Sequence, residues 1–255
     1  MQELYFRALG EGQPLIILHG LLGTSDNWIT LGKRYAEHFK VYIIDQRNHG
    51  QSFHDDEFNY PVMAQDLLDF MNSHDIDQAN IIGHSMGGKV AMTFAAEHPS
   101  RVDRLIIADI GPQAYPPHHE TIFKGLFSLD LAKLELRKEA DEKLSEHIPD
   151  FGVRQFLLKN LARNGDSFEW KMNLEIIAKE IDRIGMGLSQ NASYDGSTLF
   201  VRGGKSDYVK DSDMNLIHSI FKNCELKTIE GVGHWLHAEK PDAFYDLTLD
   251  YLQNG

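Results

Sequence analysis

The chain has 255 residues, with 25 Lys and Arg against 38 Asp and Glu, and a formal net charge of -13. This acidic balance argues against a nucleic-acid binder and against docking on anionic lipid, because both need a basic face. The single cysteine, Cys224, excludes an intrachain disulfide. The first residues lack a basic segment followed by an apolar run, and no apolar run approaches about 18 residues. We therefore expect a soluble, cytoplasmic globular protein with no signal peptide and no membrane span.

Strand and helix patterns alternate through the first half of the chain. Residues 2–9 alternate in polarity, as in an edge strand. Four short apolar runs then follow: Leu15–Leu18, Val41–Ile44, Ile81–Ile82 and Leu105–Ala108. Such runs are typical of strands that helices bury on both faces. Helical periods over residues 60–73 and 86–98 separate some of them. The alternation predicts an α/β fold with a mostly parallel central sheet flanked by helices.

The pattern changes after Pro112. Pro116-Pro117 interrupts the chain, and residues 119–190 show only helical periodicity, with no strong strand candidate. Strand patterns return at Leu199–Val201 and Leu226–Ile229, before a last helix over 241–253.

One α/β domain with an insertion explains this order most simply. We expect residues 1–112 and 196–255 to form the core. Residues 113–195 would form a helical cap, or lid, inserted after the strand that ends near Asp109.

The strongest local motif is Gly83-His84-Ser85-Met86-Gly87, which follows a predicted strand and opens a predicted helix. This is the G-x-S-x-G nucleophile elbow in the context that it requires. Glycines fit there because side chains would clash with neighbouring backbone. The turn presents the serine hydroxyl at a helix N-terminus, where N–H groups favour developing negative charge. The motif predicts Ser85 as a nucleophile.

A second motif, His19-Gly20-Leu21-Leu22-Gly23, directly follows the strand Leu15–Leu18. A loop at this position can aim a backbone N–H at an oxyanion, together with the N–H of the residue after the nucleophile. We therefore expect the backbone N–H groups of Leu21 and Met86 to form an oxyanion hole.

A serine needs a base, and the base needs an acid that fixes its tautomer. His234 lies in a glycine-rich loop after the last strand, the expected late position of the base. We expect His237, three residues on, to be a helix-start or surface residue. For the acid, Asp109 and Asp207 each follow a strand, and position alone does not choose between them.

Four motifs in order resemble the α/β-hydrolase superfamily: His19-Gly20, Asp45 to Ser52, Gly83 to Gly88, and Gly233-His234 through Pro241. Within it, Asn48-His49, Asp109 to Pro112 and Gly233 to Trp235 look closest to the YbfF-type bacterial esterases. That resemblance implies carboxylesterase or acyl-thioesterase activity, a small helical cap, and no metal or cofactor. It also implies that Asp109 is the acid, with Asp207 as the alternative, and that Ser206 helps the histidine.

Other residues receive weaker expectations. Trp28, His49 and Trp235 are expected to line the substrate pocket, and Asp45 with Arg47 to frame it. If an acyl-CoA were the substrate, Arg47, Lys89 or Lys124 could meet its phosphates, although the charge of -13 gives this idea little support.

The leading hypothesis is a serine hydrolase that cleaves carboxylic esters, or acyl thioesters such as acyl-CoA, through an acyl-enzyme on Ser85. Alternatives on the same residues are a carbon–carbon bond hydrolase, a cofactor-free haloperoxidase and a slowly hydrolysing ligand receptor. The expected partner is a small-molecule substrate, with no nucleic acid and no membrane. The sequence fits a monomer and a dimer equally well.

Overall fold

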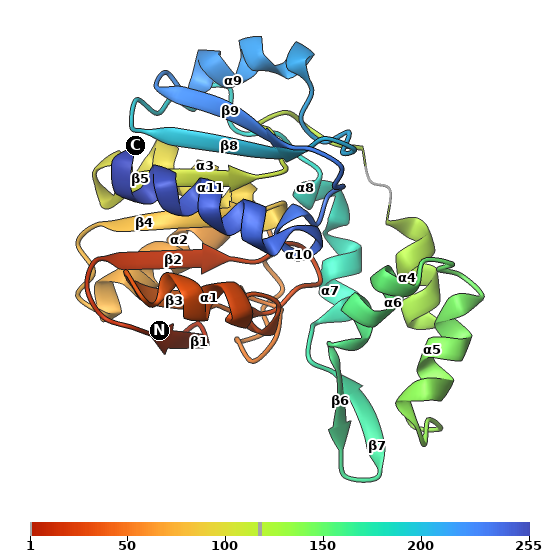
Figure 1. Ribbon diagram of the computed structural model, residues 1–255. Coiled ribbons are helices and arrows are strands. Elements are labelled where there is room, and N and C mark those ends of the chain that lie inside the picture. The colour runs from red at the N-terminus through yellow and green to blue at the C-terminus, as the bar shows by residue number, and fades with distance from the viewer. Residues whose placement is uncertain (1, 117–118) are drawn as a thin grey trace.

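A computed structural model describes residues 2–116 and 119–255. It shows a central sheet with helices on both faces and a mainly helical segment beside one end of the strands (Figure 1). Pro117, part of the predicted Pro-Pro interruption, lies outside the described residues.

The sheet has seven strands in the order β1-β3-β2-β4-β5-β8-β9. Their bounds are β1 Phe6–Leu9, β2 Pro14–Leu18, β3 Lys40–Ile44, β4 Ala79–His84, β5 Val102–Ala108, β8 Thr198–Gly203 and β9 Cys224–Ile229. The edge strand β1 pairs antiparallel with β3, and the other neighbours pair in parallel. The predicted α/β fold with a mostly parallel sheet is confirmed.

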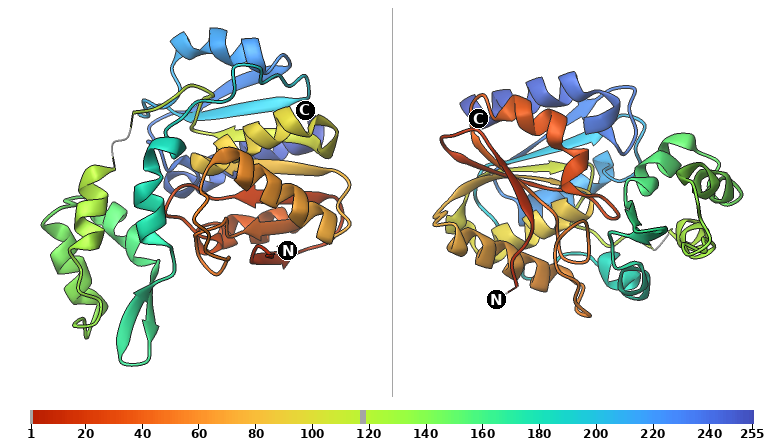
Figure 2. Two further views of the ribbon diagram at one scale, coloured as in Figure 1. Left: turned by 180° about the vertical axis from the view of Figure 1, so that it is seen from behind. Right: turned by 90° about the horizontal axis from the view of Figure 1, so that it is seen from below.

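Helices cover both faces of this sheet (Figure 2). Helices α1 (Ile29–Tyr35) and α11 (Pro241–Asn254) lie on one face, and α2 (Tyr60–Ser73) and α3 (Met86–Glu97) on the other. The remaining core elements are η1 Ser25–Asn27, η2 Pro99–Arg101, η3 Asp211–Asp213, α9 Met214–Ile220 and α10 Leu236–Glu239. In the described part of the chain, none of the helices combines the length and the apolar character that a membrane span needs.

The continuous apolar runs of the sequence follow from this double cover. In β2, Ile16 and Leu18 face the core cluster that contains α2 and α3, whereas Leu15 and Ile17 face the cluster with α1 and α11. All four side chains are at most 1% exposed. Because alternate residues of a strand point to opposite faces, both must be apolar when both faces are buried.

Residues 113–195, called the inserted segment below, connect two strands that pair directly, β5 and β8. The segment contains α4 Glu120–Phe127, α5 Arg137–Ser145, α6 Phe151–Leu158, β6 Leu161–Asn164, β7 Ser167–Trp170, α7 Leu174–Lys179 and α8 Ile181–Ile184. It lies beside the carboxyl ends of the parallel strands (Figure 1). The boundaries between core and cap remain a prediction.

The expectation of an inserted segment with helical patterns alone is wrong, because β6 and β7 form an antiparallel hairpin. Its two-residue loop is Gly165-Asp166, between the paired residues Asn164 and Ser167, and Gly165 has a φ of 60°. Gly-Asp between two extended runs is a hairpin signal, because glycine readily adopts the left-handed backbone that the first loop position needs. Each strand has only four residues, too few for alternation to stand out against the helical pattern on either side.

Candidate active site

Ser85 occupies a strained turn between the end of β4 and the start of α3. Its backbone has a φ of 53° and a ψ of -119°, which few non-glycine residues adopt. A Cβ on Gly83 would lie 2.4 Å from the Gly87 carbonyl oxygen, and one on Gly87 would lie 2.4 Å from the Leu18 oxygen. Both glycines are therefore needed for the elbow to pack against β2 and α3.

His234 lies between Ser85 and Asp109. Its Nε2 is 3.0 Å from Ser85 Oγ, and its Nδ1 is 2.8 Å from Asp109 Oδ2. Two neighbours hold the histidine from other sides. His84 Nε2 donates a 2.9 Å hydrogen bond to the His234 carbonyl, and the Tyr208 ring stacks on the imidazole at 4.0 Å. The geometry allows Ser85 to pass its proton to His234 while Asp109 fixes the tautomer.

Asp109, at the end of β5, is fully buried and also has left-handed backbone, with a φ of 52°. Besides His234, it has two hydrogen-bond donors. Gly203 N donates to Oδ1 at 3.0 Å, and the hydroxyl of Ser206 donates a short hydrogen bond to Oδ2. Three donors around one carboxylate offset part of the cost of burying its charge.

Asp207, the alternative acid, lies elsewhere. Its side chain is 94% exposed and forms a surface ion pair, 3.5 Å from Lys210 Nζ. Ser206, the adjacent residue, points instead to Asp109, as the suggested helper role requires.

The glycine-containing loop after β2 lies against the serine. A Cβ on Gly20 would be 3.2 Å from Ser85 Cβ, and Leu21, Ser85 and Met86 line the same pocket. The Met86 N–H belongs to the first residue of α3, where N–H groups have no partner within the helix. Within the described residues, the Leu21 N–H donates to no backbone carbonyl or side chain. These two N–H groups fit an oxyanion hole.

Two buried histidines, His19 and His49, fix this loop from behind. Gln46 N donates to His19 Nε2 at 3.0 Å, and Leu22 N donates to His49 Nε2 at 3.1 Å. Each Nδ1 therefore carries the proton and donates to a carbonyl, that of Gly20 and that of Arg47 respectively. Burial lowers the pKa of His19 to about 4 and that of His49 to about 3, so both rings stay neutral at physiological pH.

The expectation that His49 lines the pocket is wrong. It is fully buried behind the loop and is absent from the pocket wall, whose surface the loop itself provides. Sequence position put His49 near the site, but only the Leu22 hydrogen bond shows which way its ring faces.

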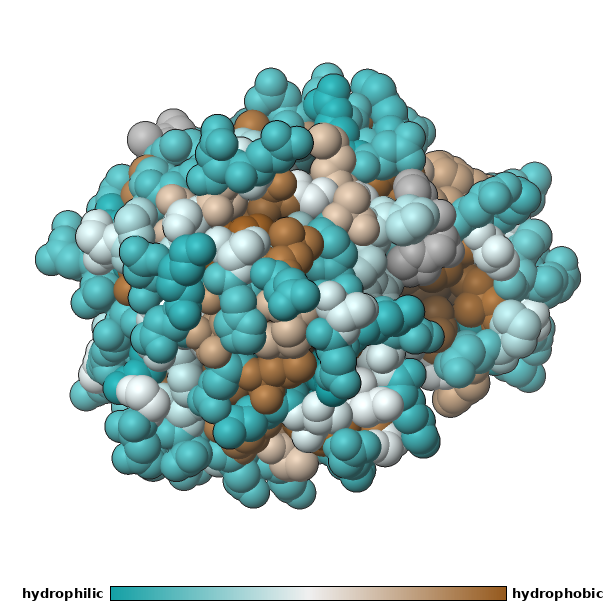
Figure 3. Space-filling model, turned by 90° about the horizontal axis from the view of Figure 1, so that it is seen from above, coloured by the Kyte–Doolittle hydropathy of each residue, from teal (hydrophilic) through white to brown (hydrophobic). Residues whose placement is uncertain are grey.

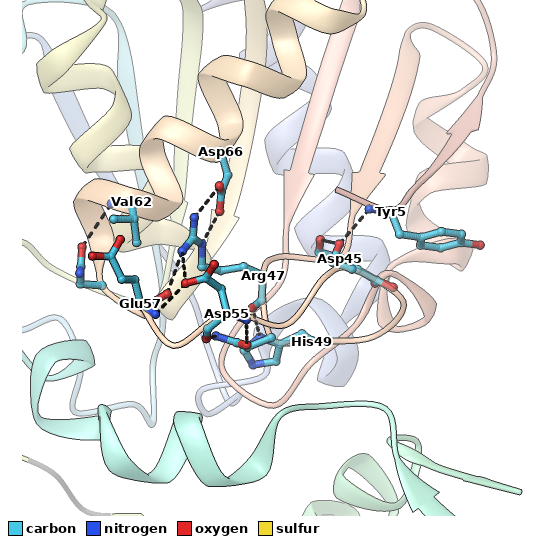
Figure 4. Close-up of polar contacts among 11 residues, drawn as sticks. Tyr5, Asp45, Arg47, His49, Asp55, Glu57, Val62 and Asp66 are labelled. Carbon is cyan, nitrogen blue, oxygen red and sulfur yellow. Dashed lines mark hydrogen bonds and ion pairs between the residues drawn. The ribbon is translucent and has the colours of Figure 1, made fainter. Parts of the chain in front are cut away.

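The segment that follows β3 frames the site, as expected for Asp45 and Arg47. Asp45 accepts hydrogen bonds from Ser25 N at 2.5 Å and Gln51 N at 2.9 Å. The Arg47 guanidinium forms a two-pronged ion pair with Asp66, at 2.5 and 2.7 Å (Figure 4). Arg47 is thus engaged in holding this segment to α2.

A pocket of about 610 Å³ opens at Ser85. Its wall combines core residues with residues of the inserted segment, including Ile110, Tyr115, Ile122, Phe156, Ile181 and Ile184. Trp28 and Trp235 line it, as expected. Seen from above, the surface is mostly hydrophilic with several apolar patches, one of them recessed on the side of the inserted segment (Figure 3).

His237 also lines this pocket. Of the two expected alternatives it is the helix-start residue, in the first turn of α10, and not a surface residue, since it is 6% exposed and stacks on Trp28 at 4.2 Å. Burial lowers its pKa to about 3, so it packs as a neutral aromatic ring.

Sequence reasoning missed two further features of the site: the stacking of Tyr208 on His234, and the burial of Lys89, which it considered only for phosphates. Tyr208, stacked on His234, follows Ser206 in a loop that offers no motif. Lys89 is 1% exposed, and its Nζ donates to the carbonyls of Pro112, Gln113 and Met186 at 3.1, 2.5 and 3.2 Å. A lysine inside the apolar face of a predicted helix is the signal that could have marked it as buried and bonded.

The fold, the elbow and the Ser–His–Asp arrangement define an α/β hydrolase. The chain matches the family model described as "alpha/beta hydrolase fold" over residues 13–145, more than half of its length. It belongs to the α/β-hydrolase family and is a hydrolase enzyme related to esterases and lipases.

Among its relatives, the esterase YbfF of Escherichia coli is 35% identical, with 96% of this chain and 94% of that protein covered. The sn-1-specific diacylglycerol lipase ABHD11 of Mus musculus is also 35% identical, with 93% and 80% covered. A solved structure, a marine microorganism esterase, is 45% identical with a TM-score of 0.96, covering 98% of this chain and all of that one. The predicted resemblance to YbfF-type esterases is confirmed.

Proposed function

We propose that the protein is a serine hydrolase that cleaves carboxylic esters through an acyl-enzyme on Ser85. The observation that carries this proposal is the hydrogen-bonded series Ser85–His234–Asp109, with distances of 3.0 and 2.8 Å, at the base of a largely apolar pocket. Nucleophile, base and acid in contact, beside N–H groups that can hold an oxyanion, are what acyl transfer requires.

In the first half-reaction, Ser85 Oγ attacks the ester carbonyl carbon while His234 Nε2 takes the hydroxyl proton. The carbonyl oxygen becomes an oxyanion held by the N–H groups of Leu21 and Met86. Asp109 stabilises the imidazolium that forms, and the hydroxyl of Ser206 holds the carboxylate in place. His234 then protonates the leaving alcohol as the carbon–oxygen bond breaks, which leaves the acyl group on Ser85.

In the second half-reaction, water repeats the sequence. His234 takes a proton from water, the resulting hydroxide attacks the acyl carbonyl, and the collapse of the oxyanion returns the proton to Ser85. The carboxylic acid leaves, and no cofactor or metal takes part in these steps. We propose that the inserted segment acts as the cap, whose apolar residues receive the acyl chain and exclude water.

An ester fits this site better than an acyl-CoA thioester. The three basic side chains considered for phosphates are engaged: Arg47 with Asp66, Lys89 with three backbone carbonyls, and Lys124 with Glu120 at 2.8 Å. We therefore place uncharged esters first, and we keep the cytoplasmic location as a proposal that rests on the sequence.

The test is turnover of p-nitrophenyl esters of increasing chain length by the wild type and by Ser85→Ala. We expect Ser85→Ala to lower kcat by at least about 10³-fold with an unchanged melting temperature, because only the hydroxyl is lost. A fluorophosphonate probe should label the wild type alone. Equal turnover by both proteins would refute the proposal, and faster turnover of acyl-CoA than of any ester would replace the ester by a thioester.

A further inference from the structure

We infer that Asn160, a residue of the inserted segment, is a positioning residue for the oxyanion hole. The inference rests on the proposed function, because it concerns how the Leu21 N–H is held for catalysis. Asn160 lies between α6 and β6, and no motif of the sequence includes it.

Asn160 is 1% exposed, and its Nδ2 donates a 2.7 Å hydrogen bond to the carbonyl of Leu22 in the loop after β2. The same amide also donates to the Leu157 carbonyl at 3.3 Å, and the backbone carbonyl of Asn160 accepts from Lys171 N at 2.8 Å. Asn160 is thus fixed by α6 and by the end of β7. Its position is set by the inserted segment, and its amide acts on a core loop 138 residues away.

The Leu22 carbonyl belongs to the peptide group whose other edge is the Gly23 N–H. That N–H donates to the Gly20 carbonyl at 3.0 Å. The Gly20 carbonyl in turn belongs to the peptide group that carries the Leu21 N–H, the proposed oxyanion donor. Two planar peptide groups therefore connect Asn160 to the oxyanion hole by hydrogen bonds in series, and bonds in such a series strengthen and align one another.

This connection acts on strained backbone. Leu22 has a φ of 59°, a left-handed conformation that leucine rarely adopts and that persists only where its surroundings hold it. His49 holds its N–H, and Asn160 holds its carbonyl. Without Asn160, the Leu22 carbonyl loses its hydrogen-bond donor, and the peptide group between Leu22 and Gly23 can rotate.

A second residue of the inserted segment holds a left-handed residue of a core loop, here through its backbone N–H. Asn173, just after β7, donates from its backbone N to the Asn48 carbonyl at 2.9 Å, and Asn48 is also left-handed, with a φ of 63°. Residues on either side of the β6–β7 hairpin, Asn160 and Asn173, are therefore bonded to the loop after β2 and to the loop after β3, whose His49 in turn bonds Leu22 N. The hairpin couples the position of the inserted segment to the alignment of the Leu21 N–H.

The test substitutes Asn160→Leu, which keeps the branched shape and the four heavy atoms of the side chain and removes the amide donors without adding charge. The matched control is Asn164→Leu, because Asn164 lies four residues further on, at the end of β6, but is exposed and bonded to Glu169. Steady-state kinetics on a p-nitrophenyl ester are combined with inhibition by a trifluoromethyl ketone, which forms a tetrahedral adduct on the serine and places its oxyanion in the hole.

We expect Asn160→Leu to lower kcat about tenfold with little change in KM, and to weaken the ketone by a similar factor, because the interaction acts on the transition state. The effect should be smaller than the roughly 10²- to 10³-fold loss on removing an oxyanion donor outright. Asn164→Leu should leave all three values unchanged. If Asn160→Leu does not fold, Asn160→Ala takes its place.

Unchanged kcat in a folded Asn160 variant would overturn the inference. A lower kcat with unchanged inhibition by the ketone would overturn it as well, since the oxyanion hole would then be intact. Failure of the proposed function looks different: the wild type itself would neither turn over esters nor react with a fluorophosphonate.

Discussion

Replacing Asp109 by asparagine tests the proposed acid, and the structure dictates how the new amide must sit. Oδ1 of Asp109 accepts from Gly203 N at 3.0 Å, so the amide oxygen of the substituted side chain must take that place. Its NH₂ group then faces His234 Nδ1, where the carboxylate oxygen of the wild type lies at 2.8 Å. Nδ1 must become an acceptor, and the proton of the neutral ring moves to Nε2.

That tautomer blocks catalysis, because Nε2 lies 3.0 Å from Ser85 Oγ and can no longer take its proton. A wrong histidine tautomer of this kind costs about 10⁴-fold in kcat in a serine protease, and we expect a loss of that order here. The fold should tolerate the change, since it removes a buried charge without altering volume.

Asp207→Asn is the matched control. Its side chain is 94% exposed, and an exposed ion pair such as that with Lys210 contributes about 0 to 1 kcal/mol. We expect kcat to stay within about twofold of the wild type. The assay is hydrolysis of a p-nitrophenyl ester by both variants, with melting temperatures measured in parallel. Similar losses in both variants, or more than a tenth of wild-type activity in folded Asp109→Asn, would refute the reasoning.

Two further predictions concern stability. Gly87→Ala places a Cβ 2.4 Å from the Leu18 oxygen and should destabilise the fold by about 3 kcal/mol or more. Gly165→Ala, where φ is 60° and no atom lies within 4 Å, should cost only about 1 kcal/mol in the same chemical unfolding assay, and equal costs would contradict the steric argument. Lys89→Met tests the buried amine, whose pKa burial lowers to about 7 from 10.5. Between these two pKa values the amine of Lys89 is protonated in the unfolded chain and neutral in the folded protein. The free energy of unfolding of the wild type relative to Lys89→Met should therefore rise by up to about 1.4 kcal/mol per pH unit from pH 7 to 10. Parallel pH profiles of the two proteins, measured by guanidinium chloride unfolding, would exclude this linkage.

Local motifs predicted much of the fold and part of the site. Apolar runs followed by Gly, Asp or His located the parallel strands, because burial on both faces leaves little freedom of composition. The elbow around Ser85 was equally well specified, since its glycines are required by contacts that any such turn must make. His234 followed from chain order.

The remaining features depend on three-dimensional contacts that one sequence does not reveal. Asp109 and Asp207 both follow strands, yet one is buried against His234 and the other points to solvent. That difference arises because β5 and β8 are neighbours, so that Gly203 N and Ser206 both reach the carboxylate that ends β5. His49 could be placed near the site, but its partner, Leu22 N, lies in another loop. Side-chain direction across loops is set by packing, and periodicity carries no information about it.

Backbone strain connects these separate observations. Within residues 2–116 and 119–255, five non-glycine residues have a positive φ: Leu22, Asn48, Asp75, Ser85 and Asp109. All except Asp75 belong to the elbow, to the proposed acid, to the loop after β2 or to the loop after β3. Each of these four is held by hydrogen bonds from another segment: Ser85 N to the Ala108 carbonyl, Asp109 N to Val201, Leu22 by His49 and Asn160, and Asn48 by Asn173. Strained residues persist only where their surroundings hold them, so the candidate site requires the neighbouring strands for its proposed nucleophile and acid. For its oxyanion loop it requires the inserted segment, and this dependence is what Asn160→Leu would measure.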